Sequence, residues 1–358
     1  MKQKRIPRIL SLDVFRGITI MLMIIVNSPG NPKPYGWLEH AAWDGCTFAD
    51  IVFPFFIMIV GVSSVLALSN LKAKNILQSK IFKKIIWRSS YIFLFGLLLN
   101  IFPYHILDWS HLRVMGVLQR IAICYFFSAI LFLTTSMRTQ ALIALIALIS
   151  YGLVPWLFSS DFVGRVDQFI FSGKHLYTKS FDPEGLMSTF PAIASALLGN
   201  LIGFLLISEK TKQKKMQYML GLAGILLLSG WGLNFILPIN KSLWSSSYVL
   251  WTTGLFLLSF SMVYGLIEIK QWRAGFKLFN LFGRHALLVY MLHVIFLKIQ
   301  AIVHVYNSAG EWVSLRLYLT DVLFSTLSIQ NAALAYSISY VMLWFVVLLG
   351  FEKIKHDV

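Results

Sequence analysis

Asp13, Arg16, Arg120 and Arg284 are among the ionisable side chains that interrupt the long apolar segments of this chain. In a membrane-spanning helix each such group costs roughly 2.5–3.5 kcal/mol on insertion scales, so each one suggests a function. Three arginines outnumber the single carboxylate, and a polyanionic ligand would balance them. Because a guanidinium binds anions with a planar fork of donors, these arginines are candidates to contact such a ligand.

Each arginine also has a structural interpretation. Asp13 and Arg16 are three positions apart, so they share a helix face and can form an internal ion pair. Arg284 lies near the end of its segment, where a long side chain can reach lipid headgroups. Lys277, shortly before it, is a further candidate for a phosphate contact. The sequence leaves ligand binding and structural pairing open at these positions.

A histidine, His40, lies in the polar stretch NSPGNPKPYGWLEHAAWDGCTFADIVFP, which follows the first apolar segment. An imidazole with an ordinary pKa of about 6.5 can serve as a base near neutral pH. Trp43 and Asp44 are candidate substrate contacts beside it. Asp50 begins the next segment, where we expect it to cap a helix. A solvated histidine without a catalytic role is the alternative.

A second polar stretch, TKSFDPEGLMSTFPAI, carries Asp182 and Glu184. Two carboxylates beside an apolar segment suit a cationic or polyhydroxyl substrate, although they are also ordinary in a solvated loop. Ser188 and Thr189 are expected to cap the helix that follows.

Motifs for several common chemistries are missing from the sequence. It has no phosphate-binding Gly-rich loop, no dinucleotide-binding turn and no Gly-x-Ser-x-Gly. Its histidines and two cysteines lack the spacing of a zinc site, so we expect no metal. Cys46 and Cys124 are expected to be free thiols.

Ten apolar segments position these residues. Each is about as long as the 20 residues that cross a ~30 Å hydrocarbon core, and hydrophobic residues make up 58% of the chain. We therefore expect an all-α, polytopic transmembrane bundle forming one domain over residues 1–358. The expected spans are 9–28, 48–69, 85–102, 114–133, 139–157, 189–207, 217–237, 248–268, 279–302 and 332–352. Residues 313–329 favour an amphipathic or re-entrant segment over an eleventh span.

The distribution of positive charge predicts the orientation. With the N-terminus in the cytoplasm, the inner segments hold 20 of the 31 Lys and Arg residues and the outer loops hold 7. This bias predicts ten spans with both termini cytoplasmic. The net charge of +16 then faces anionic lipid, and no soluble basic stretch is long enough to bind nucleic acid. The first segment lacks a small-residue cleavage site, so we expect it to be retained as a helix.

The order of these motifs resembles a known family. SLDVFRGITIMLMIIVN, EHAAWDGCTFADIVFPFFIMIVG, RVMGVLQRIAICYF, FDPEGLMSTFPAI, NKSLWSSSYVLWTTG and GRHALLVYMLH are similar to successive motifs of the heparan-α-glucosaminide N-acetyltransferase family. The resemblance covers about residues 9–300, and the tail from 303 to 358 adds little to it.

This resemblance implies a membrane acetyltransferase that takes acetyl from acetyl-CoA and delivers it to the amine of a terminal glucosamine on the outer side. It also implies that His40 is catalytic and that Asn27, at the end of the first segment, is its partner. Arg16, Arg120, Arg284 and Lys277 would then contact the CoA phosphates. Partners would be the donor, an amino sugar or glycan, and membrane lipid, with a homodimer also open.

The sequence departs from the animal lysosomal members of the family. It lacks their large amino-terminal luminal domain, and it has His285 where a smaller polar residue is expected. The bacterial inner membrane is therefore the expected location, and the physiological acceptor does not carry over. An O-acetyltransferase of a surface polysaccharide and a transporter without chemistry are the two alternatives.

Overall fold

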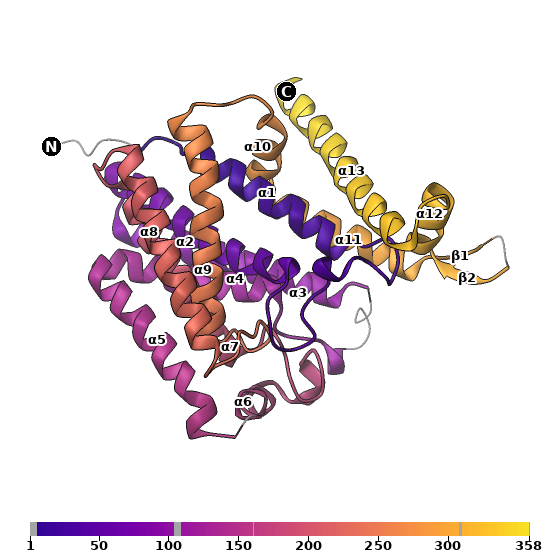
Figure 1. Cartoon of the computed structure of the whole chain (residues 1–358), viewed down its shortest axis with the longest axis horizontal. Coiled ribbons are helices and arrows are strands. Elements are labelled where there is room, and N and C mark those ends of the chain that lie inside the picture. Colours follow the sequence, from indigo (N-terminus) through magenta and orange to yellow (C-terminus); the bar gives the residue numbers. More distant parts are fainter. Residues whose placement is uncertain (1–5, 104–108, 160, 308–309, 358) are drawn as a thin grey trace. The chain divides into compact units, whose positions relative to one another are not determined.

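The protein is built almost entirely of helices. The computed structural model describes residues 6–103, 109–159, 161–307 and 310–357, with no side chains described from 354 onward. Within those residues, nine helices are long and apolar enough to cross a membrane, or ten if one bent pair counts as a span. These helices confirm the predicted polytopic α-helical fold (Figure 1).

The chain divides into two compact units, the first made of residues 1–9, 42–46 and 53–271. The first turn of α2 (Phe48–Ala73) belongs to the second unit and the remainder to the first. The other helices of the first unit are α3 (Gln78–Ile101), α4 (Val117–Thr134), α5 (Met137–Leu157), α6 (Phe162–Phe171), α7 (Leu186–Ile207), α8 (Lys212–Asn234) and α9 (Ser246–Tyr264). A π-helical turn, Gly265–Ile269, extends α9. Short 3₁₀ turns are Trp109–His111 and Gly173–His175.

The second unit comprises residues 10–41, 47–52 and 272–358. Its helices are α1 (Leu10–Asn27), α10 (Lys277–Arg284), α11 (Ala286–Ile302), α12 (Leu315–Phe324) and α13 (Ile329–Asp357), with a 3₁₀ turn at Gly36–Leu38. Two short antiparallel strands, β1 (His304–Tyr306) and β2 (Trp312–Ser314), form a hairpin in which Val305 pairs with Val313.

One predicted span differs from the structure, and the ambiguous segment that follows it contains only a short helix. The ninth span, expected to be continuous over 279–302, is broken into α10 and α11, which meet at 82° around His285. The segment 313–329 contains the ten-residue helix α12, and ten residues rise only about 15 Å, which is half of a ~30 Å hydrocarbon core. The amphipathic or re-entrant interpretation therefore fits α12, and a full span does not.

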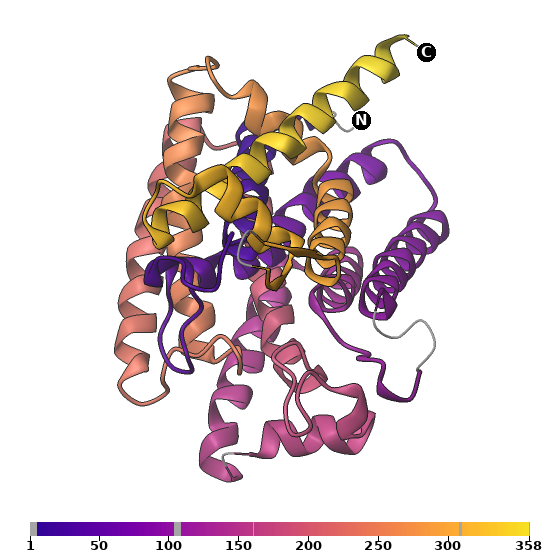
Figure 2. The same cartoon turned by 90° about the vertical axis from the view of Figure 1, so that its right-hand side faces the viewer.

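Glycines bring α8 and α9 into close contact in the first unit. A Cβ added at Gly230 of α8 would lie 2.7 Å from the backbone nitrogen of Trp251 in α9. One added at Gly254 of α9 would lie 2.7 Å from the Leu227 side chain. The two helices consequently run side by side over most of their length (Figures 1 and 2).

An even closer crossing joins α1 to α10 in the second unit. A Cβ added at Gly17 would lie 1.7 Å from the carbonyl oxygen of Phe279, and one added at Gly283 would lie 1.9 Å from that of Asp13. Backbone packs directly on backbone here, as small residues allow in membrane helices. The crossing fixes the position of Arg16 relative to Arg284 within this unit.

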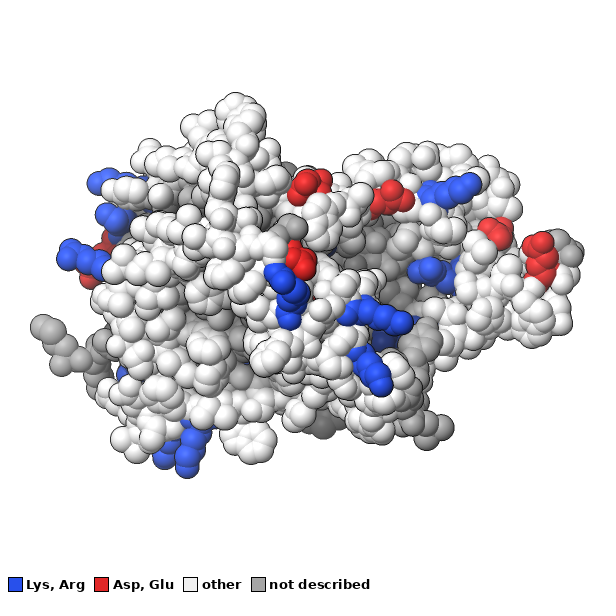
Figure 3. Space-filling view, turned by 90° about the horizontal axis from the view of Figure 1, so that it is seen from below, with Lys and Arg blue, Asp and Glu red and all other residues white. Residues whose placement is uncertain are grey.

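Large apolar side chains are exposed on several long helices, as expected of surfaces that face lipid. They include Trp87 and Leu98 on α3, Ile146 on α5, and Ile225 and Leu228 on α8. On the face drawn in Figure 3, charged side chains are few and lie scattered in a mostly uncharged surface. Only a small part of the surface of these helices is buried inside the protein. They are therefore suited to a membrane environment.

Candidate functional site

His40 forms a dyad with Asp50 within the second unit. Nδ1 of His40 lies 2.8 Å from Oδ1 of Asp50. The imidazole is about half exposed, at 51%, whereas the carboxylate is 1% exposed. A buried carboxylate thus orients a histidine that is accessible to a substrate, which is the arrangement of a general base and its positioning residue.

Three donors fix the other oxygen of Asp50. Oδ2 accepts hydrogen bonds from the backbone nitrogens of Ala41 and Thr47 and from the Thr47 hydroxyl, each at 3.0 Å. The contact with Thr47 caps the first turn of α2, so the predicted capping role of Asp50 is confirmed. With Oδ1 accepting from Nδ1–H, a neutral imidazole carries its lone pair on Nε2.

The sequence did not predict the pairing of His40 with Asp50. Their spacing is visible in the sequence, but a turn-rich loop separates the two residues and the direction of each side chain depends on how that loop folds. The Thr47 hydroxyl contributes to the loop as well, because it donates to the backbone oxygen of Glu39 at 2.6 Å.

Asn27 and Arg16 lie on α1 of the same unit. Asn27 is the last residue of that helix and its side chain is exposed. Arg16 Nη1 lies 3.0 Å from Asp13 Oδ1, which confirms the predicted ion pair, and 3.2 Å from the carbonyl oxygen of Gly283. The side chain of Arg16 is 22% exposed.

A cluster of charges forms at the junction of α10 and α11. Arg284 Nη2 lies 3.0 Å from one oxygen of Glu352, and His285 Nε2 lies 2.9 Å from the other. Glu352 comes from α13, near the end of the chain, which the sequence analysis had not connected to any site. Lys277, the first residue of α10, is exposed. The candidate phosphate ligands Arg16, Arg284 and Lys277 all belong to this second unit.

Asp182 and Glu184 bind the same arginine in the first unit. Arg113 Nη2 lies 2.6 Å from Asp182 Oδ1 and 2.5 Å from Glu184 Oε2, and Arg113 Nε lies 2.9 Å from Asp182 Oδ2. Burial would lower the pKa of Arg113, but the hydrogen bonds and charges of the two carboxylates outweigh burial and raise it. Asp182 is fully buried, while Glu184 keeps 14% of its side chain exposed.

Trp43 and Asp44 lie in a second loop of that unit. Asn240 donates to the backbone oxygen of Trp43 at 3.0 Å and to Oδ1 of Asp44 at 3.1 Å. The Trp43 ring contacts Phe181 edge-on, with ring centroids 5.7 Å apart. All four predicted acceptor contacts, Trp43, Asp44, Asp182 and Glu184, therefore belong to the first unit.

Arg120 is fully buried in the first unit, apart from the other candidate phosphate ligands. Its guanidinium donates to the carbonyl oxygens of Pro183 and Gly185 and to the hydroxyls of Ser188 and Thr189. It also lies 4.9 Å from the centre of the Trp244 ring. These contacts hold the loop that carries Asp182.

Asp167 of α6 caps α7 from a distance. Its Oδ1 accepts from the backbone nitrogens of Leu186 and Met187 at 2.9 and 3.2 Å. Burial raises the pKa of Asp167 to about 6, although these hydrogen bonds act to lower it. The predicted caps Ser188 and Thr189 instead donate to carbonyl oxygens of the preceding turn, so that prediction was wrong.

The chain is similar to proteins of a known family. The family model described as heparan-alpha-glucosaminide N-acetyltransferase, catalytic, matches residues 8–237. The chain belongs to this family. Its relatives include the human heparan-alpha-glucosaminide N-acetyltransferase, 28% identical over an alignment that covers 81% of this chain and 53% of the human protein. The mouse protein of the same name is 27% identical, with 80% and 53% covered.

The chain is thus a member of the heparan-alpha-glucosaminide N-acetyltransferase family with nine or ten candidate membrane spans in the residues that the structure describes. The chain spans about half the length of the relatives it matches. The match includes both His40 and Asp50, and it ends before α10.

Proposed function

We propose that this protein transfers acetyl from cytoplasmic acetyl-CoA to the amine of an amino sugar on the extracytoplasmic side of a membrane. The observation that carries the proposal is the 2.8 Å contact between His40 Nδ1 and Asp50 Oδ1. Within a family of acetyltransferases, an exposed imidazole held by a buried carboxylate supplies the base that amine acylation requires.

The donor binds through its phosphates in this proposal. Phosphates cannot enter hydrocarbon without partners, so the nucleotide end of CoA stays at the cytoplasmic end of the second unit. Arg16, Arg284 and Lys277 bind it there, and the apolar-tolerant pantetheine arm extends toward the opposite side. Arg120 has no part in donor binding, because its guanidinium is buried among loop carbonyls and hydroxyls.

The transfer is direct. The amine nitrogen attacks the thioester carbonyl carbon, the C–N bond forms and the C–S bond breaks. His40 Nε2 takes a proton from the acceptor nitrogen and returns it to the departing CoA thiolate, which gives an N-acetyl sugar and free CoA. Asn27 donates to the carbonyl oxygen as negative charge develops on it, a contribution of about 2.7–4 kcal/mol for comparable donors.

The acceptor binds through Glu184, Trp43 and Asp44 in the proposal. Glu184 suits an ammonium or a hydroxyl group, and the half-exposed Trp43 ring suits the apolar face of a sugar. Asp182 has no exposed surface, so it holds the loop in place through Arg113 rather than touching the sugar.

O-acetylation of a surface polysaccharide is the nearest alternative, because the same base could activate a hydroxyl. The deciding experiment is an assay with purified protein and acetyl-CoA that offers glucosamine, N-acetylglucosamine and a neutral hexose in parallel. Release of CoA thiol and formation of the acetylated sugar are both measured. We expect turnover with glucosamine alone, and turnover with only the neutral sugars would favour O-transfer.

A transporter without chemistry is tested with the same preparation. Acetyl-CoA that binds the native state raises the melting temperature, by an amount that grows with its concentration. His40→Ala should keep this stabilisation and lose acetyl transfer, whereas Arg16→Ala should lose the stabilisation. If acetyl-CoA neither stabilises the wild type nor loses its acetyl group, the proposed function is wrong.

A further inference from the structure

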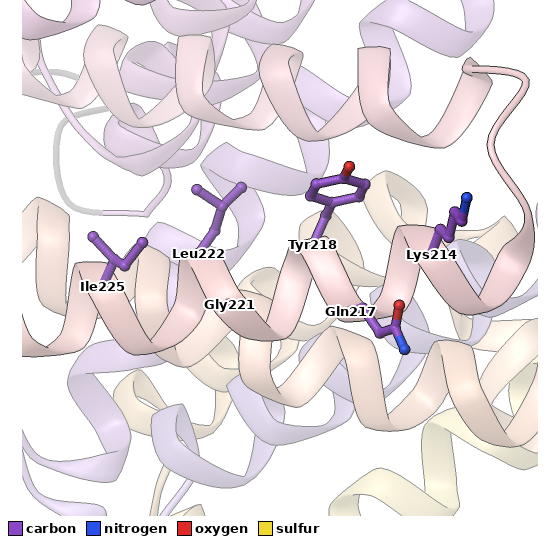
Figure 4. Close-up of a pocket in the computed structure, with 6 residues that line it drawn as sticks. All are labelled: Lys214, Gln217, Tyr218, Gly221, Leu222 and Ile225. Carbon is purple, nitrogen blue, oxygen red and sulfur yellow. The ribbon is translucent and has the colours of Figure 1, made fainter.

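The proposed reaction gives no role to a groove on α8, in the first unit. It has a volume of about 420 Å³ and is lined by Lys214, Gln217, Tyr218, Gly221, Leu222 and Ile225. In Figure 4, Lys214, Tyr218, Leu222 and Ile225 point to the same side of the helix, and Gly221 leaves the middle of that side without a side chain.

The floor of the groove is apolar and hollow. A Cβ added at Gly221 would meet no atom within 4 Å, so the space above this residue is open. Leu222 and Ile225, on the next turn, are 44% and 62% exposed. An apolar, open depression on a helix that faces lipid suits an acyl chain, which would restore the van der Waals contacts that the glycine omits.

The other end of the groove is basic. Lys214 lies at this end, and Lys210 Nζ lies 4.8 Å from the centre of the Tyr218 ring. The two neighbouring lysines bind the protein instead: Lys212 donates to the backbone oxygen of Glu268, and Lys215 to that of Leu206. Lys210 and Lys214 are therefore the cations that border the groove, beside a tyrosine of the kind that anchors at membrane interfaces.

The length of the groove matches one leaflet. Lys214 and Ile225 are separated by about 16 Å of helical rise, close to half of a ~30 Å hydrocarbon core. Under the predicted orientation, the basic end lies at the cytoplasmic surface, where anionic lipids attract Lys and Arg. The basic end, the tyrosine and the apolar hollow thus follow one another in the order of a phospholipid's headgroup, glycerol region and acyl chain. The groove is also as long as one leaflet is thick.

We propose that this groove binds one anionic glycerophospholipid, with its phosphate between Lys210 and Lys214 and one acyl chain over Gly221. A second copy of the chain is a poorer occupant. Two copies related by an axis normal to the membrane would present the same lysines to each other at the same depth. Like charges at the same depth repel each other, whereas a lipid phosphate would neutralise them.

Native mass spectrometry of the full-length protein in detergent tests the proposal, with phosphatidylglycerol or phosphatidylcholine titrated in. We expect one phosphatidylglycerol to bind in preference to phosphatidylcholine. Lys214→Gln should weaken phosphatidylglycerol binding about fivefold, which corresponds to the ~1 kcal/mol that one lysine contributes near an anionic surface. Gly221→Leu should weaken it as well, because the new side chain fills the acyl position.

Two matched variants control for general effects. Lys80→Gln removes one exposed lysine from the beginning of α3, and Gly232→Leu adds a leucine at another exposed glycine of α8 with open space above it. Both should bind phosphatidylglycerol as the wild type does. Melting temperatures of all four variants show whether each is folded.

Four results would overturn the proposal. The first is equal binding of the two lipids, and the second is equal weakening by the test and control variants, which would indicate bulk lipid contact. The third is a wild-type dimer that Gly221→Leu converts to a monomer, because the groove would then bind a second copy. Inorganic phosphate that displaced the lipid at equal concentration would show that the acyl chain contributes nothing, and would also contradict it.

Discussion

Replacing Asp50 by Asn tests the chemistry of the proposed base without removing the histidine. The Oδ2 position of Asp50 receives three hydrogen-bond donors, from Ala41 and from the backbone and hydroxyl of Thr47. An asparagine amide group must therefore place its oxygen there, since its NH₂ would meet donors. The NH₂ then takes the Oδ1 position, 2.8 Å from His40 Nδ1 in the wild type.

An amide NH₂ can only donate, so Nδ1 of His40 must accept and the ring proton moves to Nε2. The tautomer that could accept a proton from the acceptor amine is lost, while the imidazole stays in place. General base catalysis contributes about 10²–10⁴ in rate, which corresponds to about 3–5 kcal/mol of the activation free energy. We expect Asp50→Asn to reduce kcat by a factor in that range.

The assay measures release of CoA thiol at saturating acetyl-CoA and glucosamine, together with the donor Kd from calorimetry. The Kd should be unchanged, because the substitution leaves the arginines of the second unit intact. Asp161→Asn is the matched control, since its carboxylate is 66% exposed and contacts Arg165 and Ser159, neither of which belongs to the proposed site. A kcat for Asp50→Asn within threefold of the wild type, in folded protein, would refute the assignment of His40 as a base positioned by Asp50.

Three further predictions concern affinity and stability. Glu352→Gln should tighten acetyl-CoA binding up to about fivefold in calorimetry, because the carboxylate that now neutralises Arg284 is removed and exposed pairs contribute about 0.2–1 kcal/mol; an unchanged Kd would exclude Arg284 from the donor site. Gly17→Ala should lower the melting temperature by at least the equivalent of about 1–3 kcal/mol, since its Cβ would collide with α10, whereas Gly224→Ala, with open space above it, should not. Asp167 binds a proton more readily in the folded protein, with a pKa of about 6, than in the unfolded chain, so stability should fall by about 2 kcal/mol as the pH rises from 4 to 6. Melting curves of Asp167→Asn should lack this part of the pH dependence, and identical curves would contradict it.

The helical architecture was predictable because the membrane imposes it. Apolar segments near the length of the hydrocarbon core identify the spans, and the structure agrees for nine of them. The residues 279–302 predict one continuous span because they form an unbroken, mostly apolar stretch of suitable length. The break at His285 arises where Gly283 packs against α1, and such tertiary contacts leave no local pattern.

The candidate site was predictable only in part. His40 follows from its motif and from the chemistry of imidazole, and the Asp13–Arg16 pair follows from helical spacing. The sequence does not predict the ion pairs of Asp182 and Glu184, because their partner Arg113 lies far from them in the sequence. For the same reason the sequence assigned the cap of α7 to nearby hydroxyls, when the distant Asp167 fulfils that role.

The backbone contact between α1 and α10 has a consequence for donor choice. Arg16 and Asn27 lie on one rigid helix, separated by about 16 Å of axial rise, and the glycine crossing prevents α1 from sliding along its neighbour. In the proposed reaction, in which Arg16 binds the diphosphate and Asn27 the reacting carbonyl, the distance between these two groups is thereby fixed. A thioester with a truncated arm, or without the nucleotide, would reach either Arg16 or Asn27 but not both. The helix α1 would therefore select donors by length.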